Sequence, residues 1–480
     1  MRKALAMVLA VAATVCIALG TTSPAVAADG EPLANDSGTI VAPDERRPIL
    51  HGVNVVYKHP PFLPPEDEFG AADADAIAAL GFNTVRLGFI WEGMQPERPE
   101  AGGPAVDEAY LDRYAELVEL LTSRGIYVLI DSHQDLYSSV FGGEGAPPWA
   151  VLDYGFPYFP GISYWSANYF FQPAIWLAFE SFWTNRAGIQ HAYIDMWRVL
   201  AERFAGNPMV LGYEIMNEPW PGTDFLNGTK NAAKLESFYR QAIEAIRTVD
   251  DTHMIFWEPP VTSQLGVKSP ITDLGAANLA LSFHVYCPFT IARIFTVANG
   301  LWFAPLCESP NRSAIRGYDA ARVPTDSAWI LTEFGATDVV TDVALTTALA
   351  DDFLVGWMYW SWKQYDDPTG DPNEGLVVSD SGPIDYKAKV RMLDRTFARM
   401  VAGDASEMSF DPYSGRFEFA YEPDHSIDAP TEIWVAVDRH YPDGYSVEIT
   451  GGTASSSGGN IVLVDADPGA ATVAVEITAN

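Results

Sequence analysis

The chain has 480 residues, of which 63 are acidic and 29 basic, so its formal net charge at pH 7 is -34. A field of this sign repels phosphate and disfavours nucleic acids and anionic membrane surfaces as partners, but it is compatible with a neutral substrate. Hydrophobic residues make up 48% of the chain and aromatic residues 12%, which argues against disorder. At about 100–200 residues per domain, the length indicates two to four domains, or one large barrel with a small partner domain.

The first residues have the features of a secretory signal. Arg2 and Lys3 precede a long apolar run, and a small-residue cleavage site ends at Ala27. We therefore expect residues 1–27 to be removed and the mature protein to be secreted and soluble. Residues 28–46 are polar and contain Pro, Gly, Asp and Asn, so we expect them to form a flexible N-terminal segment.

Two cysteines, Cys287 and Cys307, remain in the mature chain. An exported protein can form disulfides, but the spacing of these two residues does not establish how far apart they lie in the fold. The sequence leaves open whether they pair.

From residue 47 to residue 403 short apolar runs alternate with helical periodicity, and most of these runs end in polar or aromatic residues. The eight runs are Ile49–Tyr57, Thr84–Trp91, Tyr127–His133, Val210–Glu218, Met254–Glu258, Leu279–Tyr286, Trp329–Phe334 and Gly356–Trp362. Near-continuous apolar strands that alternate with helices are typical of a parallel sheet covered on both faces, and eight units predict a (β/α)8 TIM barrel over residues 47–403. The competing doubly wound sheet should carry a glycine fingerprint after its first strand, and none is present.

Three helices are predicted where apolar residues recur at helical spacing before a glycine that can end the helix. Their apolar positions are Tyr110, Tyr114, Leu117 and Leu121 before Gly125; Ile194, Trp197, Leu200 and Phe204 before Gly206; and Val390, Leu393, Phe397 and Met400 before Gly403.

Residues 404–480 change to strict alternation of apolar and polar residues, with turn-forming clusters between the segments. The alternating sets are Phe417/Phe419/Tyr421, Ile433/Val435/Val437, Tyr445/Val447/Ile449 and Val473/Val475/Ile477. This pattern predicts a small C-terminal antiparallel β-sandwich that docks rigidly on the barrel, with Thr453–Asn460 as a Gly/Ser-rich loop.

Two glutamates stand at the ends of predicted barrel strands. Glu218 lies in Met216-Asn217-Glu218-Pro219 after the fourth strand, and Glu333 lies in Thr332-Glu333-Phe334-Gly335 at the end of the seventh. Reacting groups of such barrels sit at the C-terminal ends of strands. Two carboxyl groups about 5–5.5 Å apart there can perform retaining glycoside hydrolysis, in which one protonates the leaving oxygen and the other attacks the anomeric carbon.

With these motifs the barrel resembles glycoside hydrolase family 5. The resemblance implies Glu218 as acid/base and Glu333 as nucleophile, and it extends to six further positions: Arg86, His133, Asn217, His284, Tyr286 and Trp360. Asn217 would bind the sugar 2-hydroxyl, and Arg86 would keep Glu333 ionised by lowering its pKa. Glu218 must start protonated and should have a raised pKa. Trp360 offers a flat face to a sugar ring, although a tryptophan in a strand more often packs in the core.

A metal site is the alternative interpretation of the histidines. His133 and His284 lie on distant predicted strands, no clear third ligand accompanies them, and the chain has no His-Glu-x-x-His pair. We therefore expect neither a catalytic metal nor a cofactor.

The connection after the third strand is unusually long and aromatic. Residues 154–183 contain thirteen aromatic residues and a single charge, Glu180. Such a loop either needs a core of its own or presents an apolar surface to an aglycone at the barrel mouth. A second insertion, residues 288–324, follows the sixth strand and would form the opposite wall.

Finer motifs in both domains resemble the endoglycoceramidases. They are His133-Gln134-Asp135 with Tyr137-Ser138, the aromatic stretch that ends at Gln172-Pro173, Phe179-x-x-Phe182-Trp183, and Ala429-Pro430-Thr431-Glu432-Ile433. The resemblance implies cleavage between an intact oligosaccharide and ceramide, with Lys58, Asp135, Trp165, Tyr286 and Trp360 as sugar contacts. The expected partner is a glycosphingolipid. We expect the protein to be a monomer that contacts a lipid surface transiently.

Two other functions remain open. A β-glucanase or β-mannanase of the same family would act on a polysaccharide, but it should have aromatics strung along an open cleft and often a linked carbohydrate module. A non-catalytic glycolipid-binding protein would not need both Glu218 and Glu333 together with Arg86.

Overall fold

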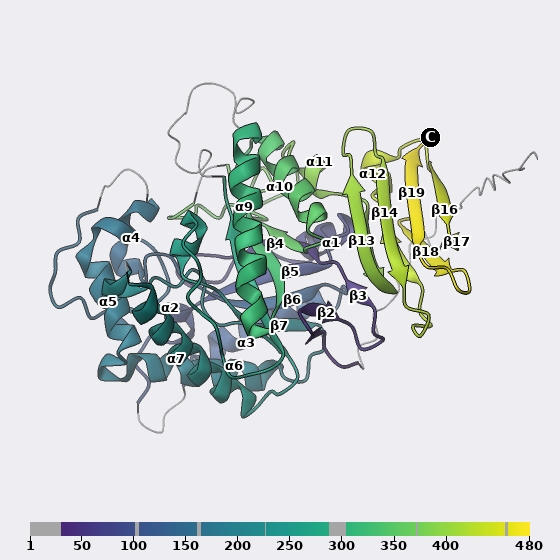
Figure 1. Ribbon diagram of the computed structural model, residues 1–480. Coiled ribbons are helices and arrows are strands. Elements are labelled where there is room, and N and C mark those ends of the chain that lie inside the picture. Colours follow the sequence, from purple (N-terminus) through teal and green to yellow (C-terminus); the bar gives the residue numbers. More distant parts are fainter. Residues whose placement is uncertain are drawn as a thin grey trace, which may run out of the picture.

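The computed structural model describes residues 30–100, 105–160, 165–225, 227–287, 304–370, 373–456 and 459–480 (Figure 1). The expected signal segment lies outside the described residues, as does the part of the second insertion that contains Phe295, Trp302 and Phe303. Within these ranges no helix combines the length and the apolar character that crossing a bilayer requires.

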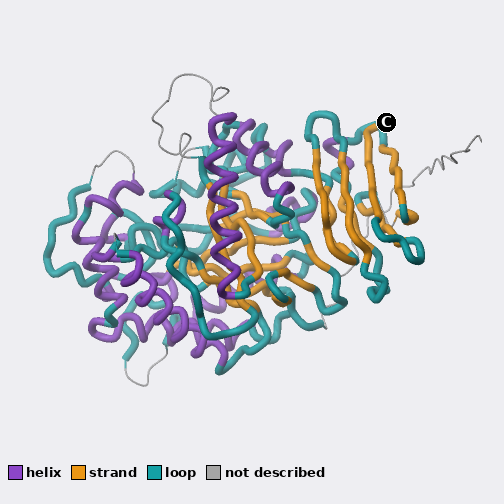
Figure 2. The backbone as a smooth tube through the Cα atoms, viewed as in Figure 1, coloured by secondary structure: helices purple, strands orange, loops and turns teal. Residues whose placement is uncertain are grey.

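Eight parallel strands close into a barrel in the order β10-β11-β4-β5-β6-β7-β8-β9, which confirms the predicted fold class. Figure 2 shows strands in the middle of this domain with helices around them. The strands are β4 (His51–Val55), β5 (Thr84–Ile90), β6 (Tyr127–His133), β7 (Val210–Glu214), β8 (Met254–Trp257), β9 (Leu279–Val285), β10 (Ala328–Phe334) and β11 (Trp357–Tyr359). Nearly every strand residue is buried, because side chains fill the interior of the barrel and helices cover its outer face.

The helices of the barrel units and their connections vary widely in length. They are α1 (Ala71–Ala79), α2 (Trp91–Met94), α3 (Glu108–Thr122), α4 (Asn168–Phe171), α5 (Pro173–Trp183), α6 (Ile189–Phe204), α7 (Gly228–Arg247), α9 (Ala304–Arg322), α10 (Val340–Asp352) and α11 (Val390–Leu393). α3 and α6 confirm two of the three predicted helices. The side chain of Asp107 begins α3 by accepting a hydrogen bond from the backbone N–H of Tyr110.

The expectation of a flexible segment at residues 28–46 was wrong for its described part. β1 (Ala34–Asp36) and β2 (Thr39–Val41) form a hairpin, and Leu33 and Ile40 are buried against side chains at the N-terminal end of the barrel. The few apolar residues of this polar segment are spaced so that they close the bottom of the barrel.

The second domain is a sandwich of two antiparallel sheets, β17-β18-β15-β12-β3 and β13-β14-β19-β16. Its elements are β3 (Arg47–Pro48), β12 (Phe397–Val401), β13 (Gly403–Phe410), β14 (Phe417–Pro423), β15 (Thr431–Trp434), α12 (Val437–His440), β16 (Tyr445–Thr450), β17 (Gly452–Ser456), β18 (Ile461–Ala466) and β19 (Val473–Ala479). The predicted loop at Thr453–Asn460 is therefore partly strand, and Val437 begins a helical turn instead of extending a strand.

The third predicted helix, Val390 to Met400, was also wrong. α11 ends at Leu393, and β12 follows with Phe397 and Val401 buried in the sandwich core. Helical spacing over the whole stretch arose because two short elements happen to be in phase. The sandwich consequently begins near residue 395 instead of residue 404.

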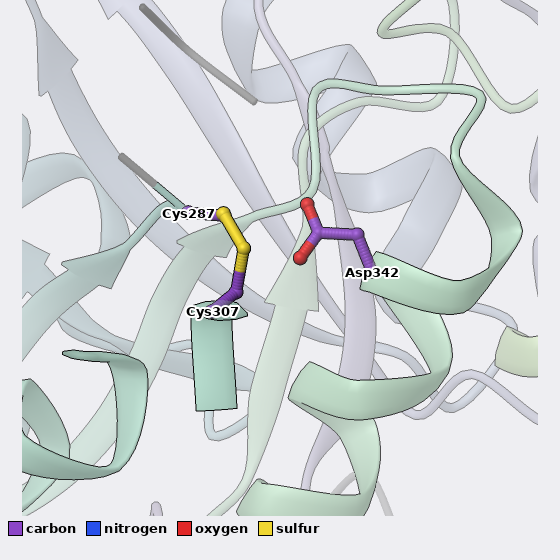
Figure 3. Close-up of side chains that lie close together, drawn as sticks. All are labelled: Cys287, Cys307 and Asp342. Atoms are coloured by element: carbon purple, nitrogen blue, oxygen red, sulfur yellow. A yellow bond between two sulfur atoms is a disulfide. The ribbon is translucent and has the colours of Figure 1, made fainter. Parts of the chain in front are cut away.

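Figure 3 shows Cys287, just after β9, joined to Cys307 in α9 by a disulfide, with a Cα–Cα distance of 5.3 Å. This settles the question that the sequence left open. Asp342 lies beside the bridge, but thiols that form a disulfide are not available as metal ligands.

Candidate active site

Glu218 and Glu333 meet at the C-terminal end of the barrel. Glu333 belongs to β10, and Glu218 follows β7 in a left-handed backbone conformation with φ of 43°. One oxygen of each carboxyl group and a ring nitrogen of His284 all lie within 4.8 Å of one another. So close an approach of the two carboxyl groups favours the short spacing of retaining glycosidases over the wider spacing of inverting ones.

Arg86 on β5 connects Glu333 to the base of the site and is completely buried. Its Nη1 donates to Oε1 of Glu333 at 2.5 Å, while Nε and Nη2 form a bidentate pair with Glu214 at 2.6 and 3.0 Å. Nη2 also donates to Oδ1 of Asn217 at 2.7 Å. A planar guanidinium with fixed donors therefore orients both Glu333 and the residue that precedes Glu218.

His284 and Tyr286, from the end of β9, fix the two glutamates from the other side. Nδ1 of His284 lies 2.7 Å from Oε1 of Glu218 and 3.4 Å from Oε2 of Glu333, and the hydroxyl of Tyr286 donates to the same Oε2 at 2.8 Å. Burial lowers the pKa of His284 to about 4. The imidazole is therefore neutral at pH 7, and Nδ1, whose neighbours are carboxylate oxygens, carries its proton.

Burial dominates the protonation of both glutamates. It raises the pKa of Glu218 to about 7, and the charge of Asp135 adds to the increase. Burial also raises the pKa of Glu333 to about 7, although His284 and Arg86 act against it. Arg86 lowers the pKa of Glu333 as expected, but desolvation of the carboxylate outweighs the ion pair, so the pKa is raised on balance. Two nearby carboxyl groups that share such pKa values hold about one proton between them near neutral pH.

A polar and aromatic wall completes the pocket beside the glutamates. The rings of Trp360 and His133 stack with centroids 5.0 Å apart, and Nζ of Lys58 lies 4.7 Å above the Trp360 ring. Lys58 also contacts Asp135 at 2.7 Å. Trp360 thus lies in the site and not only in the core, and its ring faces groups able to bind hydroxyls.

Trp165 is linked to this cluster through Tyr169. It is half-buried and packs edge-on against Tyr169, with ring centroids 6.4 Å apart. Tyr169 in turn accepts a hydrogen bond from the backbone N–H of Leu136. Trp165 therefore stands one layer of side chains away from the strand end that carries His133 and Asp135.

Several polar residues of the site were not predicted from the sequence. They are Asn54, Asp131, Glu144, Glu214, Glu258, Gln264, Asp367, Thr369 and Glu374. A signal existed for Asp131, Glu214 and Glu258, since each interrupts or ends an otherwise apolar strand. Asp367 and Thr369 come from an irregular segment after β11, where periodicity carries no information.

Compact groups of potential metal ligands occur at this end of the barrel, including His133, Asp135 and Glu144. There Nζ of Lys58 lies 2.7 Å from Asp135 and 3.5 Å from Glu144, so an ammonium group already occupies the cation position. The oxygens of Glu218 and Glu333 are engaged by donors from Arg86, Tyr286 and Gln264. The donor set suits protonation and nucleophilic attack better than metal coordination.

Comparison with known proteins agrees with this geometry. The family model for cellulase (glycosyl hydrolase family 5) matches residues 55–366, and that for the glycoside hydrolase family 5 C-terminal domain matches residues 395–478. Endoglycoceramidase I of Rhodococcus hoagii (strain 103S) is 35% identical over 467 residues, which cover 94% of this chain and 87% of that protein.

Solved structures of endo-glycoceramidase II from Rhodococcus sp. also match. Its complex with ganglioside GM3 has a TM-score of 0.76 and 27% identity, covering 94% of this chain and 100% of that one. Its lactosyl-enzyme intermediate has a TM-score of 0.75 and 28% identity, covering 94% and 99%. The chain therefore belongs to glycoside hydrolase family 5 and, within it, to the endoglycoceramidases.

Proposed function

We propose that this protein is a retaining endo-β-glycosidase that hydrolyses the bond between the oligosaccharide and the ceramide of glycosphingolipids. The observation that carries the proposal is the pair formed by Glu218 and Glu333, held within 4.8 Å at the barrel mouth. The relative trapped as a lactosyl-enzyme intermediate supports a covalent mechanism, and the relative bound to ganglioside GM3 supports the substrate class.

In the first step a carboxylate oxygen of Glu333 attacks the anomeric carbon while Glu218 protonates the oxygen that leaves with ceramide. Oε1 of Glu218 accepts hydrogen bonds from Gln264 at 2.5 Å and from His284 at 2.7 Å, so the acidic proton resides on Oε2. In the second step Glu218, now ionised, removes a proton from water, and the water oxygen displaces Glu333 to release the intact oligosaccharide.

The connection between β6 and α6 supports a lipid aglycone. Both expectations for this aromatic stretch contribute, since Phe179 and Phe182 form a core with Trp183 while other rings are exposed. The connection leaves β6 at its C-terminal end, which is the end of the barrel where the glutamates lie. The exposed aromatics, called here the mouth aromatics, are Tyr154 (59%), Phe156 (50%), Phe159 (64%) and Phe171 (66%). Figure 1 shows α4 and α5 of this connection on the side of the barrel away from the sandwich, so the sandwich does not cover them.

The proposal extends to where and how the enzyme works. Residues 1–27 have the pattern of a cleaved signal, which supports secretion. The mature enzyme would act as a monomer that touches lipid only transiently through the mouth aromatics, since its negative charge gives it no electrostatic attraction to anionic membranes.

The direct test is incubation of the purified protein and detergent with lactosylceramide, glucosylceramide, galactosylceramide and a ganglioside. We expect intact glycan and ceramide as products, identified by mass spectrometry, and the panel shows which ceramide-linked sugar is accepted. Release of single sugars from the non-reducing end, or turnover of cellulose or mannan alone, would contradict the glycolipid assignment and favour the polysaccharide alternative.

Replacing Phe159 and Phe171 by Ser should weaken activity on lipid substrates selectively. The two exposed rings would become partly buried when the lipid binds, and full burial of a phenylalanine is worth about 1.5–3 kcal/mol. Their loss should therefore lower kcat/KM for a ganglioside by about tenfold or more. A soluble aryl β-lactoside should be cleaved at the wild-type rate. The matched control is Tyr413→Ser, an equally exposed aromatic on the sandwich, which should change neither rate. Equal losses on both substrates would refute a role in lipid binding.

A further inference from the structure

The segment that follows β8 forms hydrogen bonds with the backbone and the side chain of Glu218. Oε2 of Glu258 accepts a hydrogen bond from the backbone N–H of Glu218 at 2.6 Å, and Gln264 donates to Oε1 of Glu218. The N–H of Val261 donates to the carbonyl of Pro219. Three contacts from a stretch of seven residues thus fix the position of the acid/base.

Glu258 is itself rigidly held. Its carbonyl accepts from the hydroxyl of Tyr239 at 2.7 Å, and its N–H donates to the same hydroxyl at 3.2 Å. Tyr239 is fully buried on α7. The backbone of Glu258 is therefore fixed at the end of β8, from where its carboxyl group accepts the hydrogen bond of the Glu218 backbone.

The backbone of Glu218 needs such a support. Its φ of 43° lies in the left-handed region, which a glutamate adopts at a cost of about 1–3 kcal/mol. A strained residue keeps its conformation only where its surroundings hold it, and the Glu258 carboxyl and the Gln134 side chain do so here from the ends of β8 and β6, the strands on either side of β7.

We propose that Glu258 is a positioning residue for the acid/base: it acts through the backbone N–H of Glu218 and does so as a neutral carboxylic acid. This inference rests on the proposed retaining mechanism. It assigns to the fifth barrel strand a role that the paired carboxyl groups of the fourth and seventh strands do not supply.

The surroundings of Glu258 disfavour its ionisation. Oxygen and nitrogen atoms of Glu214, Glu258 and His284 lie within 4.8 Å of one another, and the neighbouring Glu218 adds another carboxyl. Among the described residues, His284 at 3.5 Å is the only ion-pair partner of Glu258, and its imidazole is neutral. Burial, Glu218 and Glu214 raise the pKa of Glu258 well above its ordinary value, while Arg86 and the hydrogen bond from the Glu218 backbone act in the opposite direction. Tyr318 faces the site as a neutral phenol.

A neutral Glu258 leaves the protonation equilibrium of the site to Glu218 and Glu333. If Glu258 were ionised, its charge would raise the pKa of Glu218 further and move the basic limb of the pH profile upward. Glutamine has nearly the shape of a protonated glutamate and keeps the oxygen acceptor, so Glu258→Gln distinguishes the two states.

The experiment compares Glu258→Gln and Glu258→Leu on two soluble substrates, 2,4-dinitrophenyl β-lactoside and 4-methylumbelliferyl β-lactoside. Dinitrophenolate leaves without protonation by an acid, whereas departure of the umbelliferone depends more on protonation. The ratio kcat/KM reports the first irreversible step, so it isolates the proton transfer to the leaving group.

For Glu258→Gln we expect kcat/KM within about twofold of wild type on both substrates and an unchanged basic limb. For Glu258→Leu we expect a loss of about 100-fold or more on the umbelliferyl lactoside, the scale of general acid catalysis, and less than about fivefold on the dinitrophenyl lactoside. Glu202→Leu, an exposed glutamate on α6, is the matched control and should leave both rates unchanged.

Equal losses of Glu258→Leu on both substrates would show a merely structural role and overturn the proposal. A basic limb that moves to lower pH by about one unit or more in Glu258→Gln would show an ionised Glu258 and also overturn it. Should the leucine variant fail to fold, the pH profile of Glu258→Gln still decides the protonation state, and Gln264→Leu tests the grip on Glu218 with the same pair of substrates. Because both substrates are soluble aryl glycosides, failure here is separate from failure to cleave ceramide.

Discussion

Glu333→Ser is expected to lower hydrolysis of glycosphingolipids and aryl lactosides by about 10⁴-fold or more, the scale on which covalent catalysis depends on its nucleophile. Serine is too short to place an oxygen where Oε2 of Glu333 lies, beside the hydroxyl of Tyr286. Arg86 keeps its bidentate pair with Glu214, so the variant should fold like the wild type. The measurement is kcat/KM together with thermal unfolding.

The identity of the nucleophile has an independent check. A 2-fluoro lactoside with a good leaving group should trap the wild-type enzyme as a covalent adduct, and mass spectrometry of the digested protein should locate the sugar on Glu333. Glu333→Ser should not be labelled, but it should transfer lactose from lactosyl fluoride of inverted configuration to an acceptor alcohol. A label on Glu218 or on another carboxyl group would contradict the assignment.

Arg86→Leu is expected to have the largest effect on stability. The guanidinium lies 2.5 Å from Glu333, 2.6 Å from Glu214 and 3.1 Å from Asp131, all in the buried base of the site. Removing one partner of a buried ion pair leaves uncompensated charge and costs about 3–5 kcal/mol in the free energy of unfolding. The free energy of unfolding of Arg86→Lys should lie between those of the wild type and Arg86→Leu, because an ammonium group keeps the charge but cannot replace the bidentate contact with Glu214.

The pH dependence of this loss follows from the carboxyl groups that remain. Burial already raises the pKa of Asp131 and of Glu333 to about 7 in the presence of Arg86, and removal of the guanidinium raises both further. Their unfolded-state pKa values are about 4, so the folded wild type holds extra protons and loses stability as the pH rises from about 4 to 7. In the variant the folded-state pKa values lie higher, so its loss of stability continues above about pH 7, where that of the wild type has ended. The deficit of Arg86→Leu should therefore be larger at pH 8 than at pH 5. Chemical unfolding at both values tests it, and an equal deficit would argue against charge as the cause.

The sequence predicted the barrel well because most strands carry two signals, a run of apolar residues and a polar or aromatic residue at its end. Tyr127–His133, for instance, is a run of buried residues that ends in a histidine, and the structure has a strand with the same bounds. A strand inside a closed barrel is shielded on both faces, so its hydrophobic pattern depends little on its neighbours. The rule that reacting groups lie at the C-terminal ends of barrel strands placed Glu218 and Glu333 at one end of the barrel, and the family resemblance added Arg86 and Trp360.

The parts that escaped prediction depend on neighbours distant in the chain. Phe397 fits a helix or a strand equally well until its partner strand β15 is known. Leu33 and Ile40 are too few to predict a structured segment unless it is known that they pack against the N-terminal end of the barrel. The pKa of Glu333 depends on how deeply its carboxyl group is buried, and the presence of Arg86 in the sequence does not reveal that depth.

The pairing of β3 with β12 also bears on how the polypeptide is made. Arg47 and Pro48 leave the ribosome early, but their partners Val401 and Met400 emerge only after the whole barrel has been synthesised. This edge of the sandwich stays unpaired throughout that interval, and contacts between such distant parts of a chain form late. A nascent chain released before β12 therefore leaves β3 unpaired, whereas the pairing of β3 with β12 ties the segment that leads into the barrel to the sandwich.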